Sequence, residues 1–97
     1  MQRHQRQIQP TDLKAKAIGV VVRELRDQAG VSQERLSADC GFDRTYISRV
    51  ERGIINPTVS RLWKIADALE TPLSQIARQM ENWIAAQERS AKKPNRG

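Results

Sequence analysis

The segment 32–53, SQERLSADCGFDRTYISRVERG, constrains the fold of this 97-residue chain more than any other part of it. Ser32 and Asp43 are favourable helix N-cap residues. Each precedes a short stretch whose apolar residues have helical spacing. Gly41 lies between the two stretches and Gly53 follows the second, and glycine readily adopts the left-handed conformation that ends a helix. The segment therefore predicts two short helices separated by a tight turn.

Three further stretches predict helices around this segment, at residues 12–28, 58–69 and 72–88. Thr11 or Asp12 is placed to cap the first of them. Their apolar residues recur at helical spacing: Leu13, Ala17, Ile18, Val21, Val22 and Leu25; Val59, Leu62, Ile65, Ala66 and Leu69; Leu73, Ile76, Ala77, Met80, Trp83 and Ile84. We therefore expect an all-α fold of five helices.

Both ends of the chain differ in composition from the middle. Residues 1–11 and 89–97 are polar and basic, which is typical of flexible arms. Residues 12–88 contain the predicted helices, and we expect the last helix, about 72–88, to serve dimerisation. The net charge is +6, and the two arms account for all of it, because residues 12–88 hold equal numbers of basic and acidic residues. The charge of the whole chain therefore says little about the folded part.

The sequence excludes several classes of protein. Cys40 is the single cysteine, so an intramolecular disulfide is excluded and a cytoplasmic location is expected. No stretch approaches the roughly 18 apolar residues of a membrane span. The single histidine, His4, lies in the N-terminal arm, and no Cys/His cluster has the spacing of a metal site. We expect no enzyme activity, no cofactor or metal, and no membrane partner.

Basic and hydroxyl side chains occupy the outer face of the predicted helix 44–52. Ile47 and Val50 are its inward positions. The outward positions include Arg44, Thr45, Ser48 and Arg49. An arginine fork can bind both acceptors of guanine in the DNA major groove, and threonine can contact the methyl group of thymine. These four residues are therefore candidates to read DNA bases.

The residues that flank this helix are candidates to bind DNA phosphates. Gln33 begins the first short helix, where free amide groups and the helix dipole favour an anion. Arg52 is the last residue of the second short helix, Asn56 lies in the loop after it, and Arg61 lies on the next helix. Phosphate contacts position a protein on the duplex without reading its sequence. We expect these four residues to hold the DNA backbone.

Glu51 is the one acidic residue in the otherwise basic helix 44–52. Arg26 lies towards the carboxy-terminal end of the first predicted helix, which three-helix packing would bring close to Glu51. We expect a partly buried Arg26–Glu51 ion pair that orients the two helices. The alternative is that both charges are exposed and never meet.

The segment 19–69 resembles the phage repressor and Cro-type helix-turn-helix proteins, the XRE family. The residues that carry the resemblance are Leu25-Arg26, Ser32-Gln33, Leu36, Gly41, Ile47-Ser48, Val50 to Gly53, Pro57, Leu62, Ile65-Ala66 and Leu69. Ser37 replaces an alanine that is usual in the family. Tyr46 is bulky for an edge position, where it either contacts the DNA backbone or packs on the first helix. The resemblance implies a lambda-repressor-like domain with the helix-turn-helix at helices 2–3, and it also implies the Arg26–Glu51 pair.

The resemblance further implies a transcriptional regulator that binds a palindromic operator in double-stranded DNA as a homodimer. One helix reads only a few base pairs, which are too few to select a genomic site. The apolar stripe of the last helix offers a dimer interface, and the candidate interface residues are Ile76, Met80, Trp83 and Ile84. Trp63, on the preceding helix, belongs either to this interface or to the intramolecular core.

Two other readings stay open. Leu73, Ile76 and Met80 could instead close the intramolecular core. The size and layout of the regulator also resemble restriction–modification controller proteins and DNA-binding antitoxins. The alternative function is an antitoxin-like or partner-binding interaction module for which DNA contact is secondary.

Overall fold

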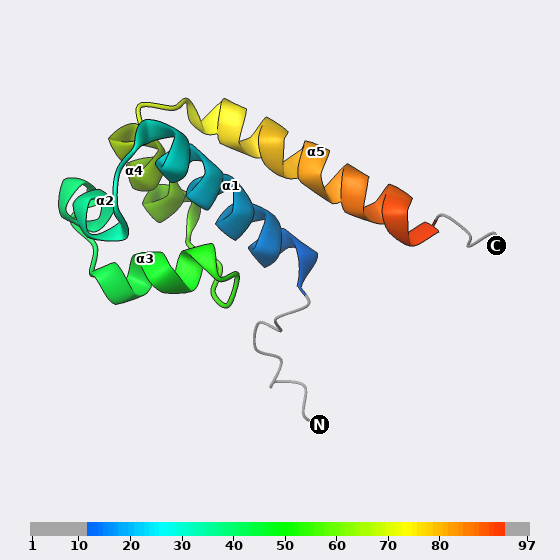
Figure 1. Ribbon diagram of the computed structural model, residues 1–97, viewed down its shortest axis with the longest axis horizontal. Coiled ribbons are helices and arrows are strands. Elements are labelled where there is room, and N and C mark those ends of the chain that lie inside the picture. The colour runs from blue at the N-terminus through cyan, green and yellow to red at the C-terminus, as the bar shows by residue number, and fades with distance from the viewer. Residues whose placement is uncertain (1–11, 93–97) are drawn as a thin grey trace, which may run out of the picture.

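The computed structural model describes residues 12–92, which form five α-helices and no strand. The helices are α1 (Leu13–Ala29), α2 (Gln33–Cys40), α3 (Arg44–Glu51), α4 (Val59–Ala68) and α5 (Leu73–Lys92). α1 packs against both α5 and α3, and α2 packs against α3 and α4 (Figure 1). Within this part of the chain, no helix is both long and apolar enough to cross a membrane. The predicted all-α fold of five helices is confirmed.

Side-chain caps hold the first turns of three helices. Asp12, Ser32 and Thr58 each accept a hydrogen bond from a backbone amide of the following turn, at 3.0, 3.0 and 3.1 Å. The prediction that Asp43 caps α3 in the same way is wrong for its side chain, which makes no cap hydrogen bond. The backbone carbonyl of Asp43 begins the hydrogen bonding of α3 instead, accepting from the amide of Tyr46 at 2.9 Å.

Gly41 makes the predicted turn between α2 and α3. Its φ is 79°, in the left-handed region that side chains with a Cβ rarely adopt. Its amide donates to the carbonyl of Ser37 at 2.8 Å and so closes the last turn of α2. The chain can therefore leave α2 sharply and enter α3 only three residues later.

α5 is longer than predicted. It continues to Lys92, so residues 89–92 are helical and do not belong to a flexible tail. The sequence has no glycine or proline at positions 89–93. Pro94 is the first helix-breaking residue, and proline disfavours helical geometry in the residue before it. The predicted arms at 1–11 and 93–97 lie outside the described residues.

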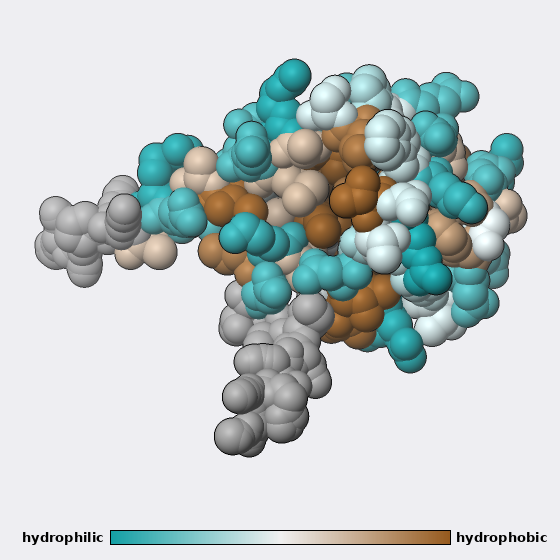
Figure 2. Space-filling model, turned by 180° about the vertical axis from the view of Figure 1, so that it is seen from behind, coloured by the Kyte–Doolittle hydropathy of each residue, from teal (hydrophilic) through white to brown (hydrophobic). Residues whose placement is uncertain are grey.

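All five helices contribute residues to the hydrophobic core. It consists of Ile18, Val21, Val22, Leu25, Leu36, Ile47, Val50, Leu62, Ile65, Ala66, Leu69 and Ile76. Two residues that were predicted to face the core are exposed, Leu13 by 36% and Val59 by 65%. Each is the first residue of its helix. It shares the spacing of the apolar face, but its side chain is exposed. Hydrophobic residues also reach the surface, where they gather across the middle of the face seen from behind (Figure 2).

Candidate nucleic-acid interface

α3 is fixed to the core by one side and open to solvent on the other. Ile47 and Val50 are completely buried beneath it. The opposite side presents the predicted base-reading residues: Arg44, Thr45 and Arg49 are exposed and Ser48 is half-buried. Helical spacing predicts that these side chains point outward, and their degree of exposure agrees with that prediction.

Within the part of the chain that the structure describes, no acidic group neutralises the arginines on α3 and directly after it. Within residues 12–92, the ion pairs join Arg26 to Asp27 and Glu51, and Arg35 to Asp39. No carboxylate of this part of the chain lies within ion-pair distance of Arg44, Arg49 or Arg52. These guanidinium groups are therefore free to bind an anionic or hydrogen-bond-accepting ligand.

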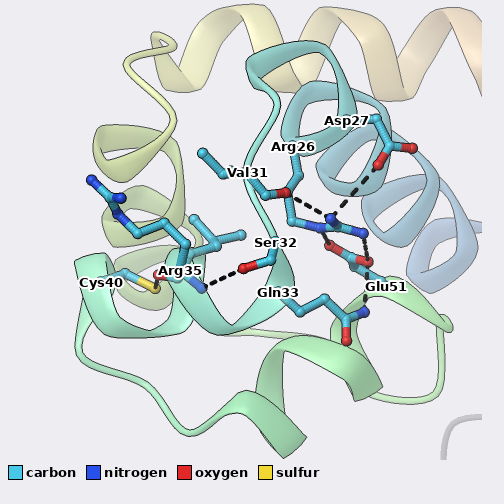
Figure 3. Close-up of polar contacts among 9 residues, drawn as sticks. Arg26, Asp27, Val31, Ser32, Gln33, Arg35, Cys40 and Glu51 are labelled. Carbon is cyan, nitrogen blue, oxygen red and sulfur yellow. Dashed lines mark hydrogen bonds and ion pairs between the residues drawn. The ribbon is translucent and has the colours of Figure 1, made fainter.

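Arg26 and Glu51 form a buried ion pair between α1 and α3 (Figure 3). Arg26 Nε donates to Glu51 Oε2 at 2.6 Å, and Nη2 donates to Oε1 at 3.0 Å. The two side chains are only 12% and 3% exposed. The hydrogen bond to Glu51 raises the pKa of Arg26, against the opposing effect of burial. This contact is the one that the lone acidic residue of the 44–52 segment led us to expect.

Gln33 belongs to the same cluster. Its Nε2 donates to Glu51 Oε1 at 2.9 Å, and the residue is half-buried. The side-chain amide predicted to bind a phosphate is thus engaged inside the protein. Sequence reasoning missed this contact because Gln33 and Glu51 lie 18 residues apart and on different helices.

A small aromatic cluster lies beside the start of α3. The rings of Phe42 and Tyr46 are 5.1 Å apart and tilted by 60°. The guanidinium carbon of Arg61 lies 5.2 Å from the centre of the Tyr46 ring, and Lys64 Nζ lies 5.9 Å from that of Phe42. Arg61 therefore approaches α3 from α4, stacked on a tyrosine whose hydroxyl is buried without a hydrogen-bond partner among residues 12–92. Phe42, which anchors this cluster, was not predicted as part of the site.

The remaining predicted phosphate contacts lie on the opposite flank of α3. Arg52 follows the last residue of α3, and Asn56 lies in the loop before α4; both are exposed. The exposed polar surface around α3 thus extends from Arg61 at one end to Arg52 and Asn56 at the other.

Cys40, at the end of α2, has the properties of a packing residue. It packs against the hydrophobic core, and its thiol donates to the carbonyl of Leu36 at 3.1 Å. Burial raises the pKa of the Cys40 thiol, so the reactive thiolate is disfavoured at neutral pH.

The predicted dimer residues on α5 differ in exposure. Ile76 is completely buried and closes the core of its own protomer, so it cannot reach a partner. Met80, Trp83 and Ile84 are half-buried. The more exposed aromatic side chain is Trp63 of α4, which is 53% exposed.

Trp63 forms one wall of a surface groove between α4 and α5. The other residues that line the groove are Pro72, Leu73, Ser74 and Ala77. The groove is mainly apolar, and it was not predicted from the stripe of α5 because its largest residue lies on the neighbouring helix.

The paired helices α2 and α3, the Gly41 turn and the buried contacts beneath α3 define a helix-turn-helix protein. Comparison with known proteins agrees: the model of the helix-turn-helix family HTH_3 matches residues 22–76, and the chain belongs to this family. Over 60 residues the chain is 37% identical to the HTH-type transcriptional regulator SutR of Escherichia coli strain K12. That match covers 62% of this chain and 34% of SutR, so the chain spans about a third of this relative's length.

Two solved structures of restriction-modification controller proteins share the fold. C.AhdI from Aeromonas hydrophila is 37% identical, with a TM-score of 0.62, over 64% of this chain and 94% of that protein. C.Esp1396I, solved as a tetramer in complex with its natural 35 base-pair operator, is 28% identical, with a TM-score of 0.62, over 69% of this chain and 93% of that one. The similarity therefore covers nearly the whole of these small proteins, whereas it covers one segment of SutR.

Proposed function

We propose that this chain is a sequence-specific DNA-binding transcriptional regulator whose α3 lies in the major groove. The observation that carries the proposal is the exposure and the unneutralised charge of Arg44 and Arg49. Both are exposed, and within residues 12–92 neither is neutralised by a carboxylate. Buried residues beneath α3 hold their backbone rigidly, which base reading requires. Thr45 and Ser48 complete the reading face.

Contacts to the DNA backbone flank this face. Arg52 and Asn56 bind phosphates beyond the end of α3, and Arg61 binds one from α4. The backbone amides at the start of α2 supply a further phosphate contact, as helix N-termini do. The proposal is supported by C.Esp1396I, a relative of the same fold that was solved on its operator.

The protein acts as a homodimer on a palindromic operator. Two copies related by a two-fold axis read two half-sites about one helical turn apart, which doubles the number of base pairs that determine specificity. The dimer contact is centred on the groove of Trp63, because a tryptophan more than half exposed is costly in water and is a common anchor of interfaces. Leu73, Ala77 and Ile84 continue this surface along α5, at positions four and seven residues apart.

Selection of bound duplexes from a random oligonucleotide pool tests the proposal. We expect a recovered consensus with two inverted half-sites. The variant Arg44→Ala/Arg49→Ala is expected to lose binding to the selected duplex while it keeps its helical content and its oligomeric state. Each bidentate arginine–guanine contact contributes about 1–3 kcal/mol of discrimination.

The matched control is Arg23→Ala/Arg78→Ala, which removes two exposed arginines from α1 and α5. It tests whether loss of positive charge alone explains the effect. Failure to recover any consensus, or equal affinities of the α3 variant and the control, would contradict the proposal. Capture of a protein partner by the α3 variant at unchanged affinity for the duplex would favour the interaction-module alternative.

A further inference from the structure

Lys16 of α1 lies against the turn that follows α3. A Cβ atom placed on Gly53 would lie 3.1 Å from Lys16 Cα and 3.2 Å from Lys16 Cγ, so the two segments are in close contact. Gly53 is buried, has a left-handed φ of 75° and directly follows Arg52. Figure 1 shows the start of α1 beside the end of α3. The side chain of Lys16 therefore leaves α1 at the flank where Arg52 is proposed to bind a phosphate.

Lys16 and Arg52 are close enough to serve one stretch of DNA backbone. Consecutive Cα atoms are about 3.8 Å apart, which places the Cα atoms of Lys16 and Arg52 within roughly 9 Å of each other. Both residues are exposed, and both have long side chains. Along each strand of a duplex, phosphates follow one another about every 3.4 Å of helix axis. Two cations at this spacing can therefore bind neighbouring phosphates.

The ammonium group of Lys16 is not neutralised by the part of the chain that the structure describes. Within residues 12–92, no carboxylate lies within ion-pair distance of it. Asp12, the acid nearest to it in the sequence, accepts hydrogen bonds from two backbone amides of the first turn of α1 instead. A lysine can pack its aliphatic stem against the protein and keep its charged end in water. Lys16 has this arrangement, because its stem contacts the turn after α3 while the residue as a whole is exposed.

We propose that Lys16 binds a DNA phosphate next to the one bound by Arg52, so that α1 contributes to the nucleic-acid interface. The inference rests on the proposed function and adds a residue to that same site. Phosphate contacts carry no sequence information, so Lys16 strengthens binding to every duplex alike. Each phosphate that a cation neutralises also releases a counterion, which makes the contact measurable in the salt dependence of binding.

Lys16→Ala tests the proposal, because alanine favours the helix and removes the charge. Dissociation constants are measured between about 50 and 200 mM salt, for the duplex selected from the random pool and for a shuffled duplex of equal length. We expect the slope of log affinity against log salt concentration to fall by about 0.9 on both duplexes. The loss of affinity should accordingly be about threefold larger at the lowest salt concentration than at the highest. An unchanged slope, or a loss confined to the selected duplex, would overturn the proposal.

Lys14→Ala is the matched control. Lys14 is an exposed lysine of the same helical turn, but the two intervening steps rotate it by about 200° to the other side of α1. Its loss should leave the slope unchanged. Equal falls for Lys14→Ala and Lys16→Ala would show a general effect of charge and would overturn the proposal.

A double variant tests whether Lys16 and Arg52 bind different phosphates. Lys16→Ala/Arg52→Ala should lower the slope by about 1.8, twice the fall expected for either single variant. A double variant with the same slope as Arg52→Ala alone would overturn the proposal.

Protection of lysines from acetylation measures the contact directly. The wild-type protein is treated with an acetylating reagent, alone and on the selected duplex, and each lysine is quantified by mass spectrometry. The duplex should protect Lys16 and leave Lys14 reactive. Equal reactivity of Lys16 with and without the duplex would overturn the proposal. A wild-type protein that binds no duplex would instead contradict the proposed function, whereas a slope that responds to Arg52→Ala but not to Lys16→Ala would overturn this inference alone.

Discussion

Gly19 of α1 lies directly against the backbone of Glu51 in α3. A Cβ atom placed on Gly19 would lie 2.5 Å from the carbonyl oxygen of Glu51 and 2.6 Å from that of Val50. Such distances are far below van der Waals contact, and both obstructing atoms belong to the backbone. The absence of a side chain at position 19 therefore sets how closely α3 approaches α1.

Gly19→Ala should separate α1 from α3 or strain both helices. The added methyl group normally favours a helix, but here it meets backbone atoms that cannot turn away. We expect a loss of about 1–3 kcal/mol in the free energy of unfolding, as for other overpacked sites. Urea unfolding followed by circular dichroism measures it. A control is Gly30→Ala: no atom of residues 12–92 lies within 4 Å of its Cβ position, so any cost there reflects its left-handed φ of 73°. A neutral or stabilising Gly19→Ala would show that α3 can move away freely.

The Arg26–Glu51 ion pair gives a second prediction about the same helix contact. Arg26→Met leaves the Glu51 carboxylate buried without its partner, and we expect the unfolding free energy to fall by about 3–5 kcal/mol. Arg26→Met/Glu51→Met removes both charges and should regain most of that loss. Thermal or urea unfolding of the two variants decides the point. Equal stabilities of the single and the double variant would mean that Glu51 finds water once Arg26 is gone.

The sequence was most informative where one residue determines local geometry. Gly41 and the N-cap Ser32 predicted helix boundaries correctly because each acts within a few residues of its own position. Helical spacing placed Ile47 and Val50 inside. The Arg26–Glu51 pair was predictable because Glu51 is the one acidic residue of its helix and three-helix packing brings Arg26 of the first helix close to it.

The features that the sequence did not reveal depend on contacts between distant segments. The hydrogen bond from Gln33 to Glu51 and the stacking of Arg61 on Tyr46 require knowledge of how three helices meet. Ile76 has the same helical spacing as the half-buried Met80 and Ile84, and only the packing of the helices shows that it is completely buried. Periodicity identifies a face of a helix, whereas the neighbouring helices determine how much of that face is covered.

Cys40 predicts a dependence of stability on pH. Because burial raises the pKa of this thiol, the folded protein keeps the proton to higher pH than the unfolded chain does. The resulting contribution is complete below the ordinary thiol pKa of 9.0 and is lost as the pH rises through the raised value. The stability difference between the wild type and Cys40→Ala should therefore shrink between about pH 8 and about pH 10. Urea midpoints at both pH values measure it, and a difference independent of pH would contradict it.

Trp63 tests the proposed dimer. Trp63→Glu places a charge in the apolar groove, and we expect the dissociation constant of the dimer to rise by about thirtyfold or more, as for a hot-spot residue. Sedimentation equilibrium measures the change. Leu13→Glu is the control, since Leu13 is also an exposed apolar residue but begins α1. If Leu13→Glu dissociates the dimer and Trp63→Glu does not, the contact lies elsewhere.

Arg52 and Arg49 differ in what they are expected to contribute to DNA binding, and salt separates the two. Arg52 follows α3 and is proposed to bind a phosphate, so Arg52→Ala should weaken binding to all duplexes alike. It should also reduce the slope of log affinity against log salt concentration by about one, because one fewer counterion is released. Arg49 is proposed to read a base, so Arg49→Ala should relax sequence preference at one position of each half-site. Fluorescence anisotropy with the selected duplex and its single-base variants, over a series of salt concentrations, measures both effects. If the variants instead show the reverse assignment, with Arg52 controlling sequence preference, α3 enters the groove further along its length than we propose.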